Sequence, residues 1–516
     1  MMSNEMITPG HETGFRPGKQ ENIAVLLLSG LGTLLLYGPV LGNSFLTDDY
    51  ASLYRIMVEK RFFHEDFLRP LIDISFYFNY IFSGLHASGY YVFNFCIHSL
   101  TCYMVYRVAL VLPYFSGRER WSFARMAGFL FLLYPFHNEA VVWLSGRLSS
   151  MAALCGLLAV FCHLMCRRPW NFFLAVLFWL IGLLAYESII VLPAMLLLLD
   201  IAVYKKSREL VRTAVAWFLA GLVYLGLRLI TGTLVMGYGI HGLTDKKADG
   251  LVVRAIKVTG RCFLPPMENP HHMTVLFAFV GMVVAGLLFL WWRKVKIYNG
   301  KLLSFLLPTG LFLLALAPAI LFGLSTRTSE GDRLMYFPSI VLCLIMAGLL
   351  SSLVRKNVWR WAILIAIALP CILFIRQNNR RWVFASETAV ALFDTVRTAD
   401  ADRVILVNVA DEWEGAFIFR NNFKTALAVN GIDSNKAVVS NYLKRLDYLA
   451  VGRSIEPILR DSSWFIYPVT RIVKERDEWR LINLETGISY RFDPLRVPVY
   501  YWDKLQLKKL ILRQGK

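Results

Sequence analysis

Two adjacent carboxylates, Asp48 and Asp49, stand a few residues beyond the first long apolar run of the chain, residues 23–41. If that run crosses a membrane, the pair lies at the membrane surface, where acid–base catalysis requires a proton acceptor and simple anchoring requires nothing acidic. The structural alternative is an aspartate pair that ends the helix and solvates the following loop. The position of the pair makes Asp48 and Asp49 candidate catalytic residues.

Further ionisable residues occur near the ends of the apolar runs, on the same predicted side of the membrane. Such residues are costly in lipid, and their convergence at one depth is typical of a functional site. Interhelical ion pairs, for instance Glu187 with Arg228, are the structural alternative. A transport pathway would instead scatter polar groups through the membrane, and the other halves of the runs look apolar. The set comprises His98, His137, Glu139, Arg147, Glu187, Arg228, Asp332 and Arg333.

The composition indicates a membrane protein that crosses the bilayer many times. Hydrophobic residues make up 57% of the 516 residues, and the mean hydropathy is +0.51. A helix needs about twenty apolar residues to cross a bilayer, and about eleven runs approach this length. They lie near 23–41, 90–111, 123–141, 149–166, 171–186, 188–204, 213–231, 274–292, 302–322, 336–353 and 359–375.

The distribution of basic residues predicts the orientation of these runs. Short loops rich in Lys and Arg stay on the cytoplasmic side, and basic residues follow the second, fourth, sixth, eighth and tenth runs, for example Arg118, Arg167, Lys205, Arg293 and Arg355. The N-terminus is therefore expected in the cytoplasm, and the Asp48–Asp49 pair and the C-terminal region outside. The first run is long enough to remain as an anchor.

The net charge does not indicate a nucleic-acid-binding protein, and the cysteines do not indicate a protein stabilised by disulfides or zinc. Much of the formal charge of +19 lies in these short loops, where topology explains it, so nucleic-acid binding is not expected. Seven of the eight cysteines fall within apolar runs and only Cys262 in a loop, which gives no disulfide framework or zinc spacing.

These patterns predict that the chain is divided into three regions. Residues 1–22 form a polar cytoplasmic tail, 23–376 a transmembrane domain, and 377–516 a less hydrophobic, mixed α/β soluble domain. The C-terminal pattern predicts helices near 381–397 and 416–429 and strands at 404–409, 464–468 and 479–492. The expected fold class is therefore a mainly α polytopic membrane protein with a small mixed α/β C-terminal domain.

Two long loops, residues 42–89 and 233–273, are expected on the outer side of the transmembrane domain. The first contains a helical apolar stripe, which is expected to lie on the membrane surface. The residues of the stripe are Leu71, Ile74, Ser75, Phe78 and Phe82.

Several motifs resemble those of one enzyme family, the transmembrane and TPR-containing protein O-mannosyltransferases. Residues 134–147, YPFHNEAVVWLSGR, are similar to the His-Pro-x-His-x-Glu-Ala-Val…Gly-Arg stretch of that family. Residues 45–50 match its aromatic-x-Asp-Asp stretch and residues 69–71 its Arg-Pro-Leu. Residues 186–193 match Lys-Glu…Pro, and residues 332–339 match Glu-Arg-Tyr-x-Tyr…Pro-Ser. In order and spacing these motifs extend over roughly the first 380 residues.

The resemblance implies a glycosyltransferase of the GT-C class, which takes a polyprenyl-phosphate sugar as donor and works on the extracytoplasmic face. It looks like a bacterial relative, located in the inner membrane with a periplasmic site. The chain departs from the family at three points: Tyr134 replaces the first His, residues 148–150 lack the Asp that follows Gly-Arg, and the C-terminal domain replaces the TPR array.

The chemistry of such a transfer assigns roles to the candidate residues. Asp48 or Asp49 can act as the base, and two neighbouring carboxylates tend to raise one pKa. Arg228 and Arg333 are candidates for the donor phosphate, because a guanidinium stays charged and offers paired donors. Acceptor-binding or supporting roles fall to Arg69, His98, His137, Glu139, Arg147 and Glu187.

The metal requirement is left open. Carboxylate ligands are compatible with Mg²⁺ or Mn²⁺, but two adjacent aspartates do not establish a metal site. The other combination of ligand types, His241, Glu268, His271 and His272, lacks tight spacing.

The predicted function is an inverting glycosyltransferase that moves a sugar from a polyprenyl-phosphate donor to a hydroxyl of a protein or of an envelope glycan or lipid. The donor would enter from the membrane lipids and the acceptor from the periplasm. Two alternatives from other classes also need lipid access and polar groups at the membrane: a flippase or transporter of lipid-linked sugars, and a non-catalytic assembly protein for envelope glycans.

Overall fold

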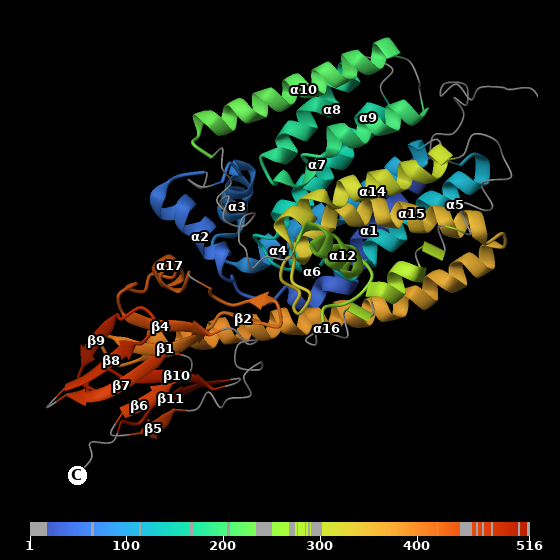
Figure 1. Ribbon diagram of the computed structural model, residues 1–516. Helices are drawn as coiled ribbons and strands as arrows, with labels where there is room; N and C mark the ends of the chain where they lie inside the picture. Colours follow the sequence, from blue (N-terminus) through green and yellow to red (C-terminus); the bar gives the residue numbers. More distant parts are fainter. Residues whose placement is uncertain are drawn as a thin grey trace, which may run out of the picture.

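The computed structural model consists of a large helical part and a C-terminal part rich in strands (Figure 1). The structure describes residues 18–512 except for 63–66, 113–114, 166–168, 204–206, 234–249, 268–273, 276, 284, 287–288, 290–301, 421, 444–456, 461–462, 467–468, 476–477 and 504–505.

Long helices occupy ten of the eleven apolar runs. The eleventh run, 274–292, lies partly outside the described residues, as does most of the N-terminal tail 1–22. The ten helices are α1 (Lys19–Tyr37), α4 (Ala87–Val111), α5 (Gly117–Leu132), α7 (Arg147–Leu164), α8 (Pro169–Leu183), α9 (Leu192–Val203), α10 (Ser207–Ile230), α14 (Leu302–Phe322), α15 (Tyr336–Leu353) and α16 (Asn357–Thr398).

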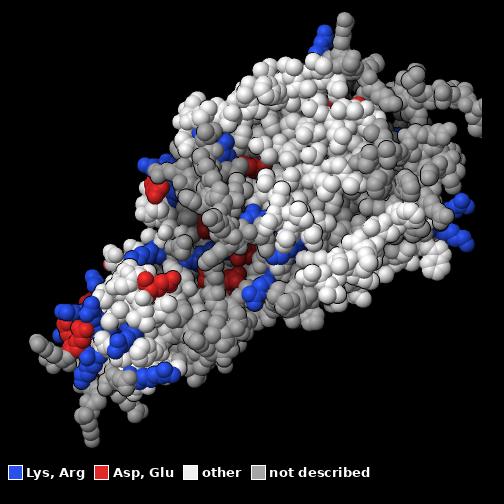
Figure 2. Space-filling view, in the orientation of Figure 1, with Lys and Arg blue, Asp and Glu red and all other residues white. Residues whose placement is uncertain are grey.

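Five helical segments of the described chain are long and apolar enough to cross a membrane: Lys19–Val40, Arg147–Leu164, Leu210–Ile230, Asp332–Leu353 and Asn357–Thr398. The chain is therefore a multi-pass membrane protein, although the expected number of eleven spans is not confirmed. Helix α9, with 12 residues, is too short by itself. Figure 2 shows that the helical part presents a largely uncharged face, whereas charged side chains gather over the C-terminal region and at its border with the helices.

The N-terminal ends of α1, α5 and α16 lie close together, at the end of the bundle where the basic loops were expected. Arg360 pairs with Glu119 at 2.7 Å, and Arg125 pairs with Glu21 at 2.7 Å. These contacts fit helices that alternate in direction, with the even-numbered loops on one side. Which side is cytoplasmic stays a prediction.

The first long loop folds into three helical segments: α2 (Asp48–Tyr54), a π-helical turn (Arg55–Glu59) and α3 (Pro70–Ser83). Helix α3 exposes the apolar side chains of Ile74, Tyr77, Phe78, Ile81 and Phe82, which share one face at helical spacing.

The apolar stripe predicted on this helix is wrong at one residue. Ser75 is buried, and its hydroxyl donates to the carbonyl of Ile72 at 2.7 Å. Ser75 directly follows the exposed Ile74, and successive residues of a helix point about 100° apart, so its side chain points toward the bundle, where a hydroxyl can find polar partners. Whether α3 lies on a membrane surface stays a prediction.

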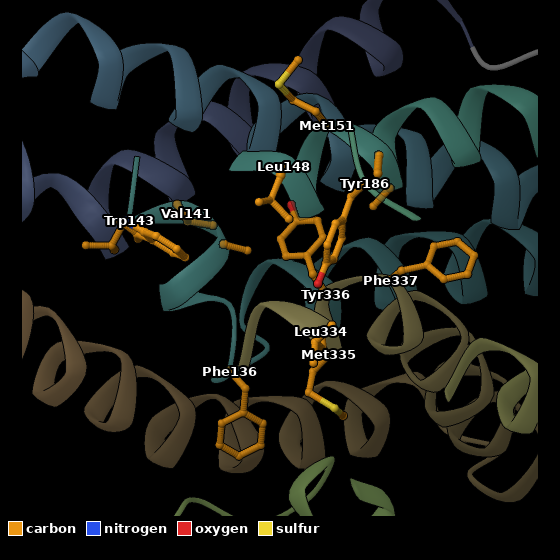
Figure 3. Close-up of a cluster of buried hydrophobic side chains, with 14 of the residues drawn as sticks. Phe136, Val141, Trp143, Leu148, Met151, Tyr186, Leu334, Met335, Tyr336 and Phe337 are labelled. Carbon is orange, nitrogen blue, oxygen red and sulfur yellow. The ribbon is translucent and has the colours of Figure 1, made fainter. Parts of the chain in front are cut away.

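Short helices lie between the long ones at the end of the bundle opposite the N-terminal ends of α1, α5 and α16. They are α6 (Asn138–Val141), two 3₁₀ turns (Glu187–Ile189 and Asp332–Met335) and, within the predicted loop 233–273, α12 (Leu251–Arg261). Figure 3 shows apolar side chains from several of these segments meeting in one buried cluster, which holds the segments in place. Its labelled members are Phe136, Val141, Trp143, Leu148, Met151, Tyr186, Leu334, Met335, Tyr336 and Phe337.

Helix α16 corrects the prediction of two separate helices at 359–375 and 381–397. It runs for 42 residues without interruption, with Pro370 inside it, and reaches from the bundle to the strands (Figure 1). The polar sequence after residue 375 suggested a break, but helical residues such as Asn378 and Asn379 bond to other parts of the protein instead. The predicted domain boundary at 376/377 falls inside this helix, and the division into domains stays a prediction.

The C-terminal part contains two sheets and a hairpin. The first sheet has the order β11-β10-β1-β4, with β1 (Val404–Ala410) parallel to both neighbours. The second is antiparallel with the order β5-β6-β7-β8-β9. The other strands are β2 (Glu412–Trp413), β3 (Ala416–Phe417), β4 (Ala437–Leu443), β5 (Ile458–Arg460), β6 (Ser463–Ile466), β7 (Thr470–Glu475), β8 (Glu478–Asn483), β9 (Ser489–Phe492), β10 (Val499–Asp503) and β11 (Gln506–Lys509).

The predicted helix 416–429 is shorter than expected. Helix α17 covers only Phe423–Val429, because residues 416–417 pair with β2 in a hairpin. Helix α17 and residues 418–419, which follow the hairpin, contact the first loop.

Candidate active site

Asp49 is a buried residue that fixes the first loop to the bundle. Its side chain is 1% exposed, and its Oδ2 accepts the backbone N–H of Leu46 at 3.0 Å. Its Oδ1 accepts both the backbone N–H and the hydroxyl of Ser145, at 2.8 and 2.7 Å. Its burial and these three hydrogen bonds hold the side chain of Asp49 against Leu46 and Ser145.

Asp48 lies differently, although it is the next residue in the chain. Its carboxylate is only half-buried, and Oδ1 accepts the side-chain amide of Asn422 at 2.7 Å. The hydroxyl of Thr47 is also within 3.5 Å of this oxygen. Among the described residues, no hydrogen bond is formed to Oδ2 of Asp48.

The burial of Asp49 has a consequence for stability. Burial raises its pKa to about 7, against the effect of its three hydrogen bonds and with a small contribution from Asp48. A raised folded-state pKa means that the folded protein holds this proton more tightly than the unfolded chain, whose carboxyl has a pKa of about 3.9. The stabilisation is therefore complete below about pH 4 and is lost as the pH rises through 7.

We expect the stability of the wild type relative to Asp49→Asn to fall by about 2 kcal/mol between pH 5.5 and pH 8, since Asn does not titrate. Thermal unfolding of both proteins in the same detergent, at a series of pH values, measures this difference. A difference that is constant across the range would show that Asp49 is ionised throughout.

Glu139 and Arg333 form a buried pair between α6 and the 3₁₀ turn before α15. The backbone N–H of Arg333 donates to Oε2 of Glu139 at 2.9 Å, and its guanidinium pairs with Oε1. The guanidinium carbon also lies 5.2 Å from the ring centroid of Trp143. The side chain of Arg333 is 16% exposed.

Glu187 holds two arginines at once. Arg69 donates to its Oε2 from Nε at 3.0 Å and from Nη2 at 2.8 Å, and Arg228 donates to Oε1 at 3.1 Å. Arg228 also donates to the carbonyl of Thr233 at 2.9 Å and to the hydroxyl of Tyr224 at 3.1 Å. The interhelical pair of Glu187 with Arg228, the structural alternative raised from the sequence, is confirmed.

Arg147 is fully buried at the start of α7. Its guanidinium donates to Oδ1 of Asn79 at 2.6 Å and to the carbonyls of Leu144 and Tyr90 at 3.0 and 3.3 Å. The ring of Phe76 lies 4.5 Å away. Arg147 therefore ties α3 and α4 to α7.

His98 and His137 lie side by side in the interior, with ring centroids 5.4 Å apart. His98 Nδ1 is 2.7 Å from the hydroxyl of Tyr336, and His137 Nε2 is 2.8 Å from the hydroxyl of Ser339. Both partners belong to the start of α15. The two histidines thus join α4 and the segment before α6 to α15, beneath the Glu139–Arg333 pair.

Several residues of the site were not found from the sequence. Asn422 reaches Asp48 from 374 residues away, and Ser145 reaches Asp49 from 96 residues away. Arg261 forms a buried pair with Asp332. No local pattern marks Asn422 or Arg261, whereas Ser145 lies inside the stretch 134–147 that the sequence had already singled out.

One expectation about the membrane interior is wrong. His163 on α7 and Asp200 on α9 form a buried pair at 3.0 Å, toward the end of the bundle opposite the candidate site. That half of the bundle is therefore not uniformly apolar. Both residues stand within otherwise hydrophobic helices, where a single polar residue gives little signal.

The described residues contain no group of three or more His, Cys, Asp or Glu side chains arranged to hold a metal ion. The possible ligands His241, Glu268, His271 and His272 lie outside the described residues. The metal requirement is therefore as open as it was from the sequence.

The chain resembles the TMTC protein O-mannosyltransferases. It is 32% identical to protein O-mannosyl-transferase tmtc2 of Xenopus laevis over 161 residues, which are 28% of this chain and 18% of the relative. It is 34% identical to Tmtc1 of Drosophila melanogaster over 126 residues, 24% of this chain and 14% of the relative. For human TMTC2 the identity is 29% over 178 residues, 30% of this chain and 21% of the relative.

These matches are local, since the matched part is no more than 21% of the length of any of the three relatives. It is also shorter than the roughly 380 residues over which the motifs extend. No protein-family model matches the chain. Among solved structures, the crystal structure of ArnT from Cupriavidus metallidurans bound to undecaprenyl phosphate has a TM-score of 0.47 and 11% identity, covering 86% of this chain and 97% of that chain.

Proposed function

We propose that this protein is a membrane glycosyltransferase of the GT-C class, which transfers a sugar from a polyprenyl-phosphate donor to an acceptor hydroxyl on the periplasmic face of a bacterial inner membrane. One observation carries the proposal most directly. Asp48 presents a half-buried carboxylate at the outer end of the apolar bundle, while its neighbour Asp49 is fixed by three hydrogen bonds. The similarity to named protein O-mannosyltransferases supports it.

The proposed reaction is a single displacement in which Asp48 is the base. The acceptor hydroxyl gives its proton to Asp48 as its oxygen forms the new bond to the anomeric carbon of the sugar. The bond between that carbon and the phosphate oxygen breaks, and polyprenyl phosphate leaves with the electron pair. A single displacement of this kind inverts the configuration at the anomeric carbon.

Arg333 is the proposed cation for the departing phosphate. A guanidinium near the leaving group stabilises the charge that develops there. The side chain of Arg333 is 16% exposed, whereas that of Arg228 is 4% exposed and is engaged with Glu187, Tyr224 and Thr233. We therefore assign Arg228 to loop anchoring, together with Arg69, Arg147, Glu187, His98 and His137, and Glu139 to the orientation of Arg333.

A reconstituted assay tests the proposed function. Purified protein in liposomes receives a polyprenyl-phosphate mannose with labelled sugar, because the matched relatives are named mannosyltransferases, together with a membrane extract as the source of acceptors. We expect a glycosylated product without any ion gradient and with inverted anomeric configuration. Movement of the intact donor between leaflets without sugar transfer would indicate that the protein is a flippase or transporter of lipid-linked sugars. Neither transfer nor movement, across several donor sugars, would favour the assembly protein.

Arg333→Lys is expected to raise the dissociation constant for the donor lipid roughly tenfold, about 1.4 kcal/mol. Lysine keeps a positive charge beside Glu139 but loses the planar paired donors that suit a phosphate. Arg360→Lys is the matched control, because Arg360 is also a buried arginine paired with a glutamate but lies at the opposite end of the bundle. Equal donor affinity in both variants and in the wild type would remove Arg333 from the phosphate site.

A further inference from the structure

The segment between β1 and α17 lies against the loop that carries Asp48. The backbone N–H of Thr47 donates to the carbonyl of Ile418 at 2.9 Å, and its hydroxyl donates to the carbonyl of Phe419 at 3.2 Å. Nearby, the backbone N–H of Ser44 donates to the hydroxyl of Ser386 on α16 at 2.8 Å. The first loop and the C-terminal region thus form one hydrogen-bonded unit across more than 300 residues of sequence.

Both ends of α17 contact the Asp48–Tyr50 stretch. At its N-terminal end, Asn422 donates to Oδ1 of Asp48 at 2.7 Å. At its C-terminal end, the side chains of Asn430 and Tyr50 share a hydrogen bond. The ring of Tyr50 also stacks on Phe419, with centroids 6.3 Å apart. Helix α17 packs on α2 through these contacts (Figure 1), and among them the bond from Asn422 is the one made to Asp48 itself.

The backbone at this junction is strained on both sides. Thr47 has φ of 33° and Arg420 has φ of 42°, values in the left-handed region that residues other than glycine rarely adopt. Such strain persists only where surrounding contacts fix the conformation, and it concentrates at functional sites. In the hairpin, a Cβ at Gly415 would lie 2.5 Å from the backbone nitrogen of Ser329, so the hairpin approaches the loop before Arg333 as closely as backbone allows.

Arg420 connects the same segment to the phosphate side of the candidate site. Its guanidinium pairs with Glu330, three residues before Arg333, and lies 3.9 Å from Asp411. Asp48 is also near enough to contribute to its electrostatic environment. The C-terminal segment therefore contacts both the loop of the proposed base and the loop of the proposed phosphate cation.

We propose that Asn422 is a positioning residue for Asp48, so that the C-terminal region completes the catalytic site. The inference rests on the proposed function. One amide donor on Oδ1 fixes the rotation of the carboxylate and directs Oδ2 toward the acceptor hydroxyl. An amide is suited to this task, because it orients a carboxylate without the full positive charge of Arg or Lys, which would reduce its affinity for a proton.

Two substitutions at Asn422 and one control test this inference. Asn422→Ala removes the donor, and Asn422→Asp keeps the size of the side chain while placing a second carboxylate beside Asp48. Asn430→Ala is the matched control, because it weakens the other end of the same helix without touching Asp48. The measurements are turnover number, KM for donor and acceptor, the pH–rate profile and the melting temperature.

We expect Asn422→Ala to lower the turnover number about 10–100-fold, the range found when the hydrogen-bond partner of a metal-binding side chain is removed, with KM for the donor unchanged. Asn422→Asp should shift the acidic limb of the pH–rate profile to higher pH, because neighbouring carboxylates disfavour ionisation of one another. Asn430→Ala should keep near wild-type turnover even where its melting temperature falls as far as that of Asn422→Ala.

Three results would overturn the inference. Equal loss of turnover in Asn422→Ala and Asn430→Ala, in proportion to lost stability, would mean that Asn422 only docks the C-terminal region. Normal turnover and a normal pH profile in both Asn422 variants, with an inactive Asp48→Asn, would refute the role of Asn422 and leave the proposed function standing. Full activity of Asp48→Asn would instead overturn the base assignment and the inference together.

Discussion

Asp48→Asn is expected to lower the turnover number by roughly 10²–10⁴-fold, equivalent to about 3–5 kcal/mol of activation free energy. Asparagine keeps the size of aspartate and can still accept the amide of Asn422 through its oxygen, but it cannot take up a proton at neutral pH. The substitution therefore separates basicity from shape. Steady-state transfer of labelled sugar, with melting temperature measured on the same preparation, provides the test.

A role in helix capping would predict a different outcome. Asp48 is the first residue of α2 and Thr47 is its N-cap, with no side-chain capping bond. Asparagine is as good as aspartate near helix starts, so a purely structural Asp48 would leave turnover and stability unchanged in the variant.

Asp49→Asn is the matched control, because it makes the same change of side chain at the residue next to Asp48. Asp49 is buried and holds Leu46 and Ser145, so its substitution should change the pH dependence of stability more than it changes turnover. Comparable turnover in the wild type, both single variants and the double variant would show that neither carboxylate is the base.

Glu187→Ala is expected to produce the largest loss of stability, about 3–5 kcal/mol, because it leaves two buried cations without a counter-charge. Arg69 and Arg228 both bind this carboxylate, and their side chains are 12% and 4% exposed. Thermal or denaturant unfolding in a fixed detergent measures the effect.

The control for this prediction is Glu21→Ala, which removes the exposed pair with Arg125. An exposed pair contributes roughly 0–1 kcal/mol, because water and salt screen it. Similar losses in the two variants would contradict the view that burial makes the Glu187 cluster important. A stable Glu187→Ala protein that has lost donor binding would instead place Arg69 or Arg228 at the phosphate.

Elements with strong local patterns were predicted well from the sequence. Ten apolar runs are helices in the structure, because a segment buried in lipid must satisfy its own backbone hydrogen bonds. Strand 404–409 was predicted to within one residue of its end, since its apolar residues are continuous. The predicted break in α16 was wrong, because helix propensity carries through the polar residues that suggested it.

The candidate site was predicted in part. The Glu187–Arg228 pair could be anticipated, because opposite charges at the same membrane depth seldom remain unpaired. The different surroundings of Asp48 and Asp49 could not, because adjacent residues at the start of a helix point in different directions, and the chain alone does not show which of them meets Ser145.

By itself, the sequence determined that this is a multi-pass membrane protein with a cluster of ionisable residues at one end of its helices, and that Asp48 and Asp49 belong to that cluster. These properties depend on hydrophobicity and on charge placement, which are readable residue by residue. The tertiary structure alone decided that Asp49 is buried against Ser145, that Asp48 remains half-buried, and that Asn422 lies 2.7 Å from Asp48. Such contacts depend on how segments hundreds of residues apart pack together, and no local pattern encodes that packing.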